Sequence, residues 1–257
     1  METHEYDLYA ITVDIDWAPD FMIDQMALAL VESGVRCTWF VTHASPAVDR
    51  LRSNPLFELG IHPNFFPGSS HGNTEDEIIQ FCLDLVPDAK SVRMHALYQN
   101  SRLIAKLSNE YGLLVDCSLF LAATPGLTPH VLYTNRMHKK LLRIPFYWED
   151  DVECFHPSPN WDIQSPIFTI NGLKMFNFHP MYVGLNECDF RNYELIKEKY
   201  QGVKSLAKLT QEEIMPYLNK GLGAKSFFMD LLDYLKRTNQ PTHTASDILH
   251  IYNSNNE

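Results

Sequence analysis

The chain has 257 residues, of which 45% are hydrophobic and 12% aromatic, so it can bury a substantial core and is not intrinsically disordered. It carries 21 basic and 32 acidic residues, and the net charge of −11 excludes a global electrostatic attraction to nucleic acid or to an anionic membrane. No apolar run reaches the roughly 18 residues of a membrane span.

Cysteine usage and the N-terminal residues favour a cytoplasmic protein. The first five residues are polar and acidic and lack the pattern of a secretory signal. Five cysteines lie far apart without a C-x-x-C pair, which is typical of reduced thiols. No repeat, low-complexity tract or Pro/Gly/Ser linker divides the chain, so residues 1–257 are expected to form one domain.

The first 120 residues are predicted to alternate strands and helices. Strands are expected at residues 8–14, 35–42, 57–61, 91–95 and 113–118. Helices are expected at residues 21–33, from Ser45-Pro46 onward, after the capping box Thr74-x-x-Glu77, and at 101–111.

The alternation is weaker after residue 120. A strand is expected at 141–146, and Asn171-Gly172 predicts a hairpin between the apolar segments IFTI and LKMFNF. A second capping box begins at Thr210, and residues 225–237 have the pattern of an amphipathic helix. Successive strand–helix units favour parallel strands, in a barrel or an open doubly wound sheet, and both architectures gather their chemistry at the carboxyl ends of the strands.

Two carboxylates follow the first predicted strand. Asp14 and Asp16 are two residues apart, so in an extended chain both side chains point to the same face. Adjacent carboxylates repel each other, and the repulsion is offset if one binds a cation and the other acts as a base. The alternative is a pair of solvated loop acids that cap the next helix.

Two histidines follow the third predicted strand. His62 ends the strand, and a loop rich in Pro, Gly and Ser then carries His71. Imidazole suits zinc and other first-row metals, and a third ligand from this loop would leave positions open for water. The alternatives are a buried histidine bonded to a backbone carbonyl for His62 and an ordinary loop residue for His71.

Later strand ends add an arginine, a histidine and aromatic residues. Arg93 is a candidate to orient a carboxylate, and His179 is a candidate acid or ligand; the alternatives are a surface arginine and a partly buried core histidine. Aromatic rings stack on sugars, although they are more often part of the core. The candidate substrate-binding residues near these strand ends are Trp17, Asn64, His95, Trp148 and Tyr182.

The order of these signals over residues 8–182 resembles the polysaccharide deacetylase superfamily, of the NodB-homology or carbohydrate esterase family 4 type. The segment Thr12–Asp16 resembles the family motif T-F-D-D-G with one residue inserted, and Arg93 matches the arginine of R-x-P-x-G, with His95 in place of proline. Phe178-His179 resembles the closing histidine motif. The combination of D-x-D-W, H-P-N-F and P-G-S-S is most similar to the branch found in surface-polysaccharide and O-antigen gene clusters.

The resemblance implies a distorted (β/α) barrel with seven strands and a metal-dependent hydrolase that removes an N-acyl group, most simply acetyl, from an amino sugar. It implies that Asp14 is the base, that Arg93 holds Asp14, and that His179 is the acid. Asp16 and His62 would bind one divalent metal, zinc being the expected ion. The resemblance gives no oligomeric state and does not identify the sugar.

The second motif departs from the family pattern. The family places two metal-binding histidines four residues apart, but the residue four after His62 is Phe66. His71 is the favoured replacement, and Asn64, a site with two protein ligands and water, or loss of the metal are the alternatives. Two rival functions therefore stay open: a hydrolase of a non-sugar C–N bond on the same fold, and a metal-free relative that only binds.

Overall fold

A computed structural model describes residues 6–134, 139–200 and 206–256. Nine strands in these parts form one sheet in the order β6-β7-β5-β4-β3-β2-β1-β9-β8. All neighbouring strands are parallel except β6 and β7, which are antiparallel. The strands are β1 (Tyr9–Asp14), β2 (Cys37–Val41), β3 (Phe57–Ile61), β4 (Ser91–Val92), β5 (Val115–Asp116), β6 (His130–Tyr133), β7 (Lys140–Arg143), β8 (Trp148–Glu149) and β9 (Lys174–Phe178).

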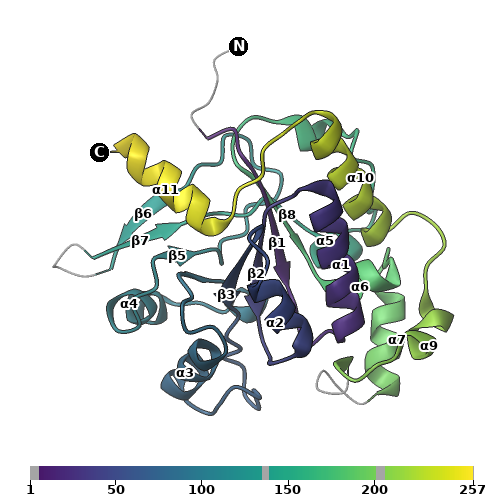
Figure 1. Cartoon of the computed structure of the whole chain (residues 1–257), viewed down its shortest axis with the longest axis horizontal. Coiled ribbons are helices and arrows are strands. Elements are labelled where there is room, and N and C mark those ends of the chain that lie inside the picture. Colours follow the sequence, from purple (N-terminus) through teal and green to yellow (C-terminus); the bar gives the residue numbers. More distant parts are fainter. Residues whose placement is uncertain (1–5, 135–138, 201–205, 257) are drawn as a thin grey trace.

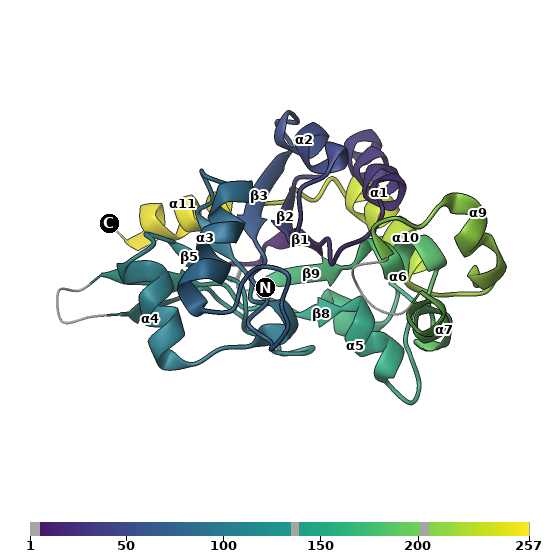
Figure 2. The same cartoon turned by 90° about the horizontal axis from the view of Figure 1, so that it is seen from below.

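Helices follow most of the strands and surround the sheet (Figures 1 and 2). The α-helices are α1 (Asp20–Ser33), α2 (Pro46–Arg52), α3 (Glu75–Leu85), α4 (Ser101–Asn109), α5 (Asp150–Phe155), α6 (Pro180–Leu185), α7 (Arg191–Lys199), α9 (Gln211–Ile214), α10 (Ala224–Arg237) and α11 (Ala245–Asn256). Short 3₁₀ helices are η1 (His95–Leu97), η2 (Pro166–Thr169) and η3 (Met215–Tyr217). Within the described ranges, no helix combines the length and the apolar character needed to cross a membrane.

The sheet curls without closing, because the edge strands β6 and β8 do not pair with each other. Seen from below, the strands curve through the middle of the molecule and the helices lie outside them (Figure 2). The expected distorted barrel is confirmed in this open form. The expected number of seven strands is wrong, since the sheet has nine strands in the described residues.

Local sequence signals account for several helix ends. Gly34 ends α1 in the left-handed conformation, as a glycine C-cap does. The Ser45 hydroxyl accepts the Val48 N–H at the start of α2. The predicted capping box is present at α3, where Thr74 and Glu77 bond each other's backbone.

The three central strands position the site. Every residue of β1, β2 and β9 is buried, which is typical of parallel strands covered on both faces. The strand β1 pairs with β2 on one side and β9 on the other. Side chains that leave the carboxyl ends of these strands therefore start from a rigid, fully packed base.

The predicted hairpin at Asn171-Gly172 is wrong. Residues 166–169 form the 3₁₀ helix η2, and β9 pairs in parallel with β1 and β8. Gly172 serves a different purpose: its φ is +102°, and an added Cβ would lie 2.6 Å from the backbone nitrogen of Leu127. The Asn-Gly signal thus marks a close approach of two backbone segments.

All five cysteines are free. Cys37, Cys82, Cys117 and Cys154 are buried, and Cys188 is half-buried. Their thiols contribute to the packing of the core and of its margin.

Candidate active site

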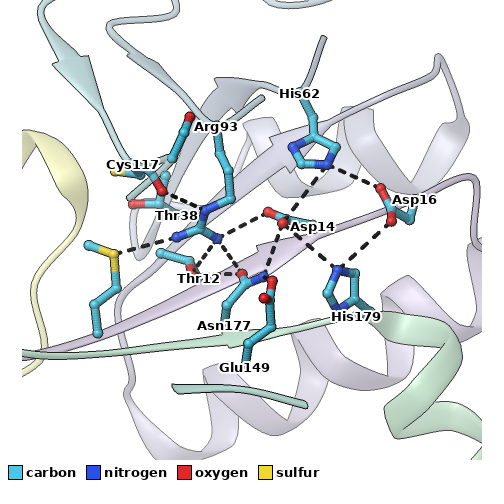
Figure 3. Close-up of polar contacts among 12 residues, drawn as sticks. Thr12, Asp14, Asp16, Thr38, His62, Arg93, Cys117, Glu149, Asn177 and His179 are labelled. Carbon is cyan, nitrogen blue, oxygen red and sulfur yellow. Dashed lines mark hydrogen bonds and ion pairs between the residues drawn. The ribbon is translucent and has the colours of Figure 1, made fainter. Parts of the chain in front are cut away.

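The carboxyl ends of β1, β3 and β9 and the residue after β4 bring together five side chains that the sequence singled out. They are Asp14, Asp16, His62, Arg93 and His179, and all except Asp16 are buried (Figure 3). In the sheet, β1 lies between β2 and β9, with β3 and β4 beyond β2. Neighbouring strand ends therefore build the site, as expected for parallel strands.

Three side chains converge on one point. Asp16 Oδ1 lies 3.2 Å from His62 Nε2 and 3.2 Å from His95 Nδ1, and the two imidazole nitrogens are 3.3 Å apart. Burial alone would raise the pKa of Asp16, but His95 and His62 outweigh it and hold that pKa well below its usual value. Asp16 is therefore ionised at neutral pH.

The Asp16, His62 and His95 group fits a zinc-sized cation. Zinc takes nitrogen and oxygen ligands at about 2.0–2.2 Å, so two tetrahedral ligand atoms lie about 3.3–3.6 Å apart. The three observed separations are close to that range. Asp16 Oδ1 is also buried without a hydrogen-bond partner in the described part of the chain, which a cation would supply. Two imidazoles and one carboxylate are a common donor set of hydrolytic zinc sites.

Two backbone segments with left-handed residues set the directions of the Asp16 and His95 side chains. Asp16 and Trp17 have φ of 37° and 56°, and Ala96 and Leu97, just after His95, have φ of 48° and 55°. Left-handed conformations in residues other than glycine cost on the order of 1–3 kcal/mol each and concentrate at functional sites. Asp16 lies in one segment and His95 comes just before the left-handed residues of the other. The strained backbone therefore sets the direction of two of the three converging side chains.

Asp14 lies beside this group but has different partners. Its Oδ1 accepts a hydrogen bond from Arg93 Nη1 at 3.1 Å, and its Oδ2 accepts one from Asn177 Nδ2 at 3.0 Å. The same Oδ2 faces the site, 3.9 Å from His62 Nε2 and 3.8 Å from His179 Nε2. A carboxylate in this position can take a proton from a molecule bound between the two histidines.

Arg93 is a fully buried cation. Its guanidinium also donates to Thr12 Oγ1 at 2.8 Å, to the Cys117 carbonyl at 2.9 Å and to Asn177 Oδ1. The rings of Phe40 and Phe146 lie 4.7 and 4.5 Å from its central carbon. This packing leaves the guanidinium one orientation and so fixes the direction of its hydrogen bond to Asp14 Oδ1.

His179 is held by a carboxylate behind it. Its Nδ1 bonds Asp150 Oδ1 at 2.7 Å, and its backbone N–H donates to Asp150 Oδ2 at 2.9 Å. Burial alone would lower the pKa of His179, but Asp150, Asp151 and Asp16 together raise it well above its usual value. The imidazole therefore carries a proton at neutral pH, and its Nε2 faces Asp14 and Asp16 at 3.8 Å each.

The structure does not place His71 in the ligand group. Its Nδ1 accepts the Asn64 N–H at 3.1 Å, and its Nε2 bonds the Thr42 carbonyl at 2.8 Å. Its ring also stacks on Phe81 at 4.9 Å. Both ring nitrogens are engaged within the protein, so the structure does not bring His71 to Asp16 and His62, and His95 lies beside them instead.

The other candidate substrate-binding residues differ in position. Trp17 and Tyr182 are buried beside the site, with ring centroids 5.4 Å from those of His95 and His179 respectively. Asn64 Oδ1 accepts the Phe66 N–H at 3.0 Å and so shapes its own loop. Trp148 is 5% exposed within a cluster of aromatic rings, and its Nε1 donates to Glu153 at 3.1 Å. The structure therefore places Trp148 in the core.

Several residues of the site escaped the sequence analysis. His95 was expected to contact substrate, and the structure places it with Asp16 and His62 in a group that could hold a metal ion. Asp150 lies in a run of acids after an aromatic residue, and that run was the available signal. Glu149 begins the same run. Asn177 had no signal, because a polar residue inside an apolar strand is visible only through its partners.

Comparisons with known proteins indicate a family and support the fold. A family model described as WbmS-like polysaccharide deacetylase matches residues 11–197. No curated protein matches the chain. Among solved structures, WbmS of Bordetella bronchiseptica, described as a polysaccharide deacetylase involved in O-antigen biosynthesis, is 30% identical, with 89% of this chain and 91% of that chain covered and a TM-score of 0.76.

A more distant structure shares the fold. The peptidoglycan deacetylase PdaC of Bacillus subtilis is 12% identical over 98% of this chain and 94% of that chain, with a TM-score of 0.51. At this identity the likeness concerns the fold alone. It agrees with the open, curled sheet described above.

Proposed function

The chain belongs to the WbmS-like polysaccharide deacetylase family, and on that premise we propose that it is a metal-dependent hydrolase that removes an N-acyl group, most simply N-acetyl, from an amino sugar of a surface polysaccharide. The observation that carries the proposal is one arrangement: a three-ligand group with a carboxylate and a protonated imidazole facing it. Amide hydrolysis needs a base for water and an acid for the leaving amine, and this arrangement offers both.

Asp14 is the proposed general base. Its Oδ2 takes a proton from water as the water oxygen bonds to the acyl carbon. Arg93 and Asn177 bond the two Asp14 oxygens from behind, so the carboxylate cannot turn away from the site. Removal of a positioned base lowers a rate by on the order of 10²–10⁴.

His179 is the proposed general acid. When the C–N bond breaks, the departing nitrogen takes the proton from His179 Nε2, and the products are the free amine and the carboxylic acid. Asp150 accepts from His179 Nδ1, which directs the Nε2–H into the site. The raised pKa of His179 keeps that proton available at neutral pH.

Asp16, His62 and His95 are the proposed metal ligands. When bound, the ion would polarise the acyl carbonyl and lower the pKa of water. The three side chains also hold each other in place, because His62 and His95 approach the same Asp16 oxygen.

Exposed aromatic rings next to the ligand group support a sugar substrate. Phe66 and Tyr98 are 43% and 41% exposed, with ring centroids 5.6 Å apart, and Phe66 lies edge-on to His95 at 6.5 Å. Aromatic faces stack well on the apolar face of a sugar ring. Phe66 occupies the position where the family pattern has its second histidine, so this departure provides an apolar rim instead of a ligand.

The proposal is tested by acetate release together with metal content. Purified protein would be loaded with zinc and offered N-acetylhexosamines as free sugars, nucleotide sugars and oligosaccharides. Asp14→Asn should keep its zinc and lose on the order of 10²–10⁴ in rate, because an amide cannot accept the proton. Asp16→Asn should lose zinc. Asp24→Asn, a surface acid paired with Arg50, is the control and should change neither value.

Each outcome has a clear meaning. Zinc binding with acetate release from a sugar supports the proposal. Release of the acyl group only from non-sugar amides would move the assignment to a different hydrolase on the same fold. Failure of the wild-type protein to bind any divalent metal would favour a relative that binds without catalysis.

A further inference from the structure

A buried amide joins two carboxyl groups behind the site. Asn177 is on the central strand β9, two residues before His179, and is fully buried. Its Oδ1 accepts hydrogen bonds from Thr12 Oγ1 at 2.8 Å and from Arg93 Nη1. Its Nδ2 donates to Asp14 Oδ2 at 3.0 Å and to Glu149 Oε1 at 2.8 Å (Figure 3).

The partners determine which way the amide faces. Arg93 has only donors, so the Asn177 atom beside it must be the carbonyl oxygen. The NH₂ group is then directed at Asp14 and Glu149, and both of its protons have an acceptor. All four hydrogen bonds involve buried or nearly buried groups, which makes the orientation costly to change.

We propose that Asn177 and Glu149 form a positioning pair for Asp14: Asn177 fixes the plane of the Asp14 carboxylate, and Glu149 fixes Asn177. This inference deepens the proposed function and rests on it for the role of Asp14 as base. Both residues are proposed to act through Asp14, so they are positioning residues and not catalytic residues.

Arg93 alone cannot fix the base. It bonds Asp14 Oδ1, and a carboxylate held at one oxygen can still rotate about its Cβ–Cγ bond. The Asn177 bond to Oδ2 removes that rotation and keeps Oδ2 directed at His62 and His179. Misplacement of a reacting group by about 1 Å costs on the order of 10²-fold in rate.

Glu149 performs its role as an uncharged acid. It is 7% exposed and forms no ion pair with a cation in the described residues. Burial is the main cause that raises the pKa of Glu149 well above its usual value, with Asp151 adding to it. A neutral carboxyl still accepts the Asn177 N–H through its carbonyl oxygen and adds no second negative charge beside Asp14.

The uncharged form of Glu149 can be tested by comparing two substitutions at this position. Glu149→Gln keeps a neutral carbonyl oxygen, so kcat should stay within about threefold of wild type, whereas Glu149→Ala should lower kcat by on the order of 10- to 100-fold. In both variants KM and zinc content should be unchanged. Glu153→Ala, in the same acidic segment but bonded to Trp148, is the matched control and should keep the wild-type kcat.

A second set of substitutions addresses Asn177 directly. Asn177→Asp replaces a donor with an acceptor beside Asp14 and should lower kcat by on the order of 100-fold. A thermal melt of each variant separates loss of folding from loss of positioning. Equal losses in Glu149→Gln and Glu149→Ala, or a wild-type kcat in Glu149→Ala, would overturn the pair.

A readout without activity keeps this inference separate from the proposed function. In a ¹H–¹⁵N spectrum, the side-chain NH₂ signals of Asn177, assigned by their loss in Asn177→Asp, should exchange slowly with solvent. They should shift in Asp14→Asn and in Glu149→Ala but not in Glu153→Ala. Fast exchange of these signals, or no shift in Asp14→Asn, contradicts the positioning pair even if the enzyme is active. If exchange is slow and both shifts occur, but the protein releases no acetate, the positioning geometry is supported and the proposed reaction is rejected.

Discussion

His95 reaches Asp16 and His62 through an uncommon turn of backbone. It begins the 3₁₀ helix η1, and the following Ala96 and Leu97 are both left-handed. This turn directs Nδ1 to within 3.2 Å of Asp16 Oδ1. In the proposed metal site, a histidine from the turn after β4 thus replaces the second histidine of the family pattern, whose position is occupied here by Phe66.

The proposed ligand role of His95 predicts that the variants His95→Ala and His71→Ala differ in zinc content. His95→Ala should lose most of its zinc, because the site would retain one imidazole and one carboxylate. His71→Ala should keep its zinc, since both His71 ring nitrogens bond within the protein. Metal analysis of the two purified variants checks this. Full occupancy in His95→Ala with loss in His71→Ala would reverse the assignment.

The sequence predicted the site residues that lie at or directly after the ends of strands. Asp14, His62 and His179 end or follow buried strands, so the rule that parallel strands gather chemistry at their carboxyl ends located them. The direction of the His95 side chain could not be predicted. It depends on two left-handed residues that are not glycine, so the sequence gives no sign of the turn. Asp16 was expected to extend the strand, yet its φ of 37° places it in a turn.

At the scale of elements, the segment after β3 is organised around a buried histidine. His71 bonds the Thr42 carbonyl across from the end of β2 and the Asn64 N–H within the segment itself. Its ring lies between Trp17 and Phe81. The predicted ligand is therefore the packing centre of the loop that presents Phe66 at the rim.

Burial of His71 predicts a pH-dependent stability. Burial is the main cause that lowers its pKa from 6.5 to about 4. Between these values the folded protein keeps His71 neutral while the unfolded chain binds a proton, so the free energy of unfolding falls as the pH drops from about 6.5 to about 4. The loss should be on the order of 2–3 kcal/mol.

Denaturant unfolding at pH 7 and pH 4.5 measures this effect. His71→Gln keeps an N–H donor and cannot titrate in this range, so its stability should fall less than that of wild type over the same interval. Identical losses in the two proteins would show that other groups cause the dependence.

Elements with strong local signals were predicted closely, whereas short strands were predicted too long or were missed. The capping boxes at Thr74 and Thr210 and the glycine after α1 located helix ends within a residue or two. Strands were expected at 91–95 and 113–118, and β4 and β5 lie inside these ranges but have only two residues each. Strand β8, also of two residues, was not predicted, because so short a strand shows no period of two. The segment IFTI lost its predicted strand because Pro166 favours the start of a helical turn.

At the scale of the whole molecule, the segments near the two ends of the chain are joined at the same sheet. An isolated bridge joins Tyr9 to Thr242, and α11 is held by hydrogen bonds from Ser246 to Glu58 and from Arg36 to Asp247. The C-terminal helix therefore packs against the strands β2 and β3 that lead to the site. These long-range contacts favour the expected organisation as one domain.

One domain predicts one unfolding transition. Circular dichroism and tryptophan fluorescence should report the same midpoint, because a single core couples the helices to the buried indoles. Trp17 lies at the site and Trp148 in the aromatic cluster around β8, so tryptophan fluorescence reports on both places. Two separated midpoints would contradict a single cooperative unit.

The most direct test of the account is the position of a bound metal. A crystal soaked with zinc and measured at the zinc absorption edge should show one anomalous peak within about 2.0–2.2 Å of Asp16 Oδ1, His62 Nε2 and His95 Nδ1. Asp14 and His179 should lie beside that peak, outside bonding distance. A peak on His71, a peak bound by Asp14, or no peak at all would contradict the account.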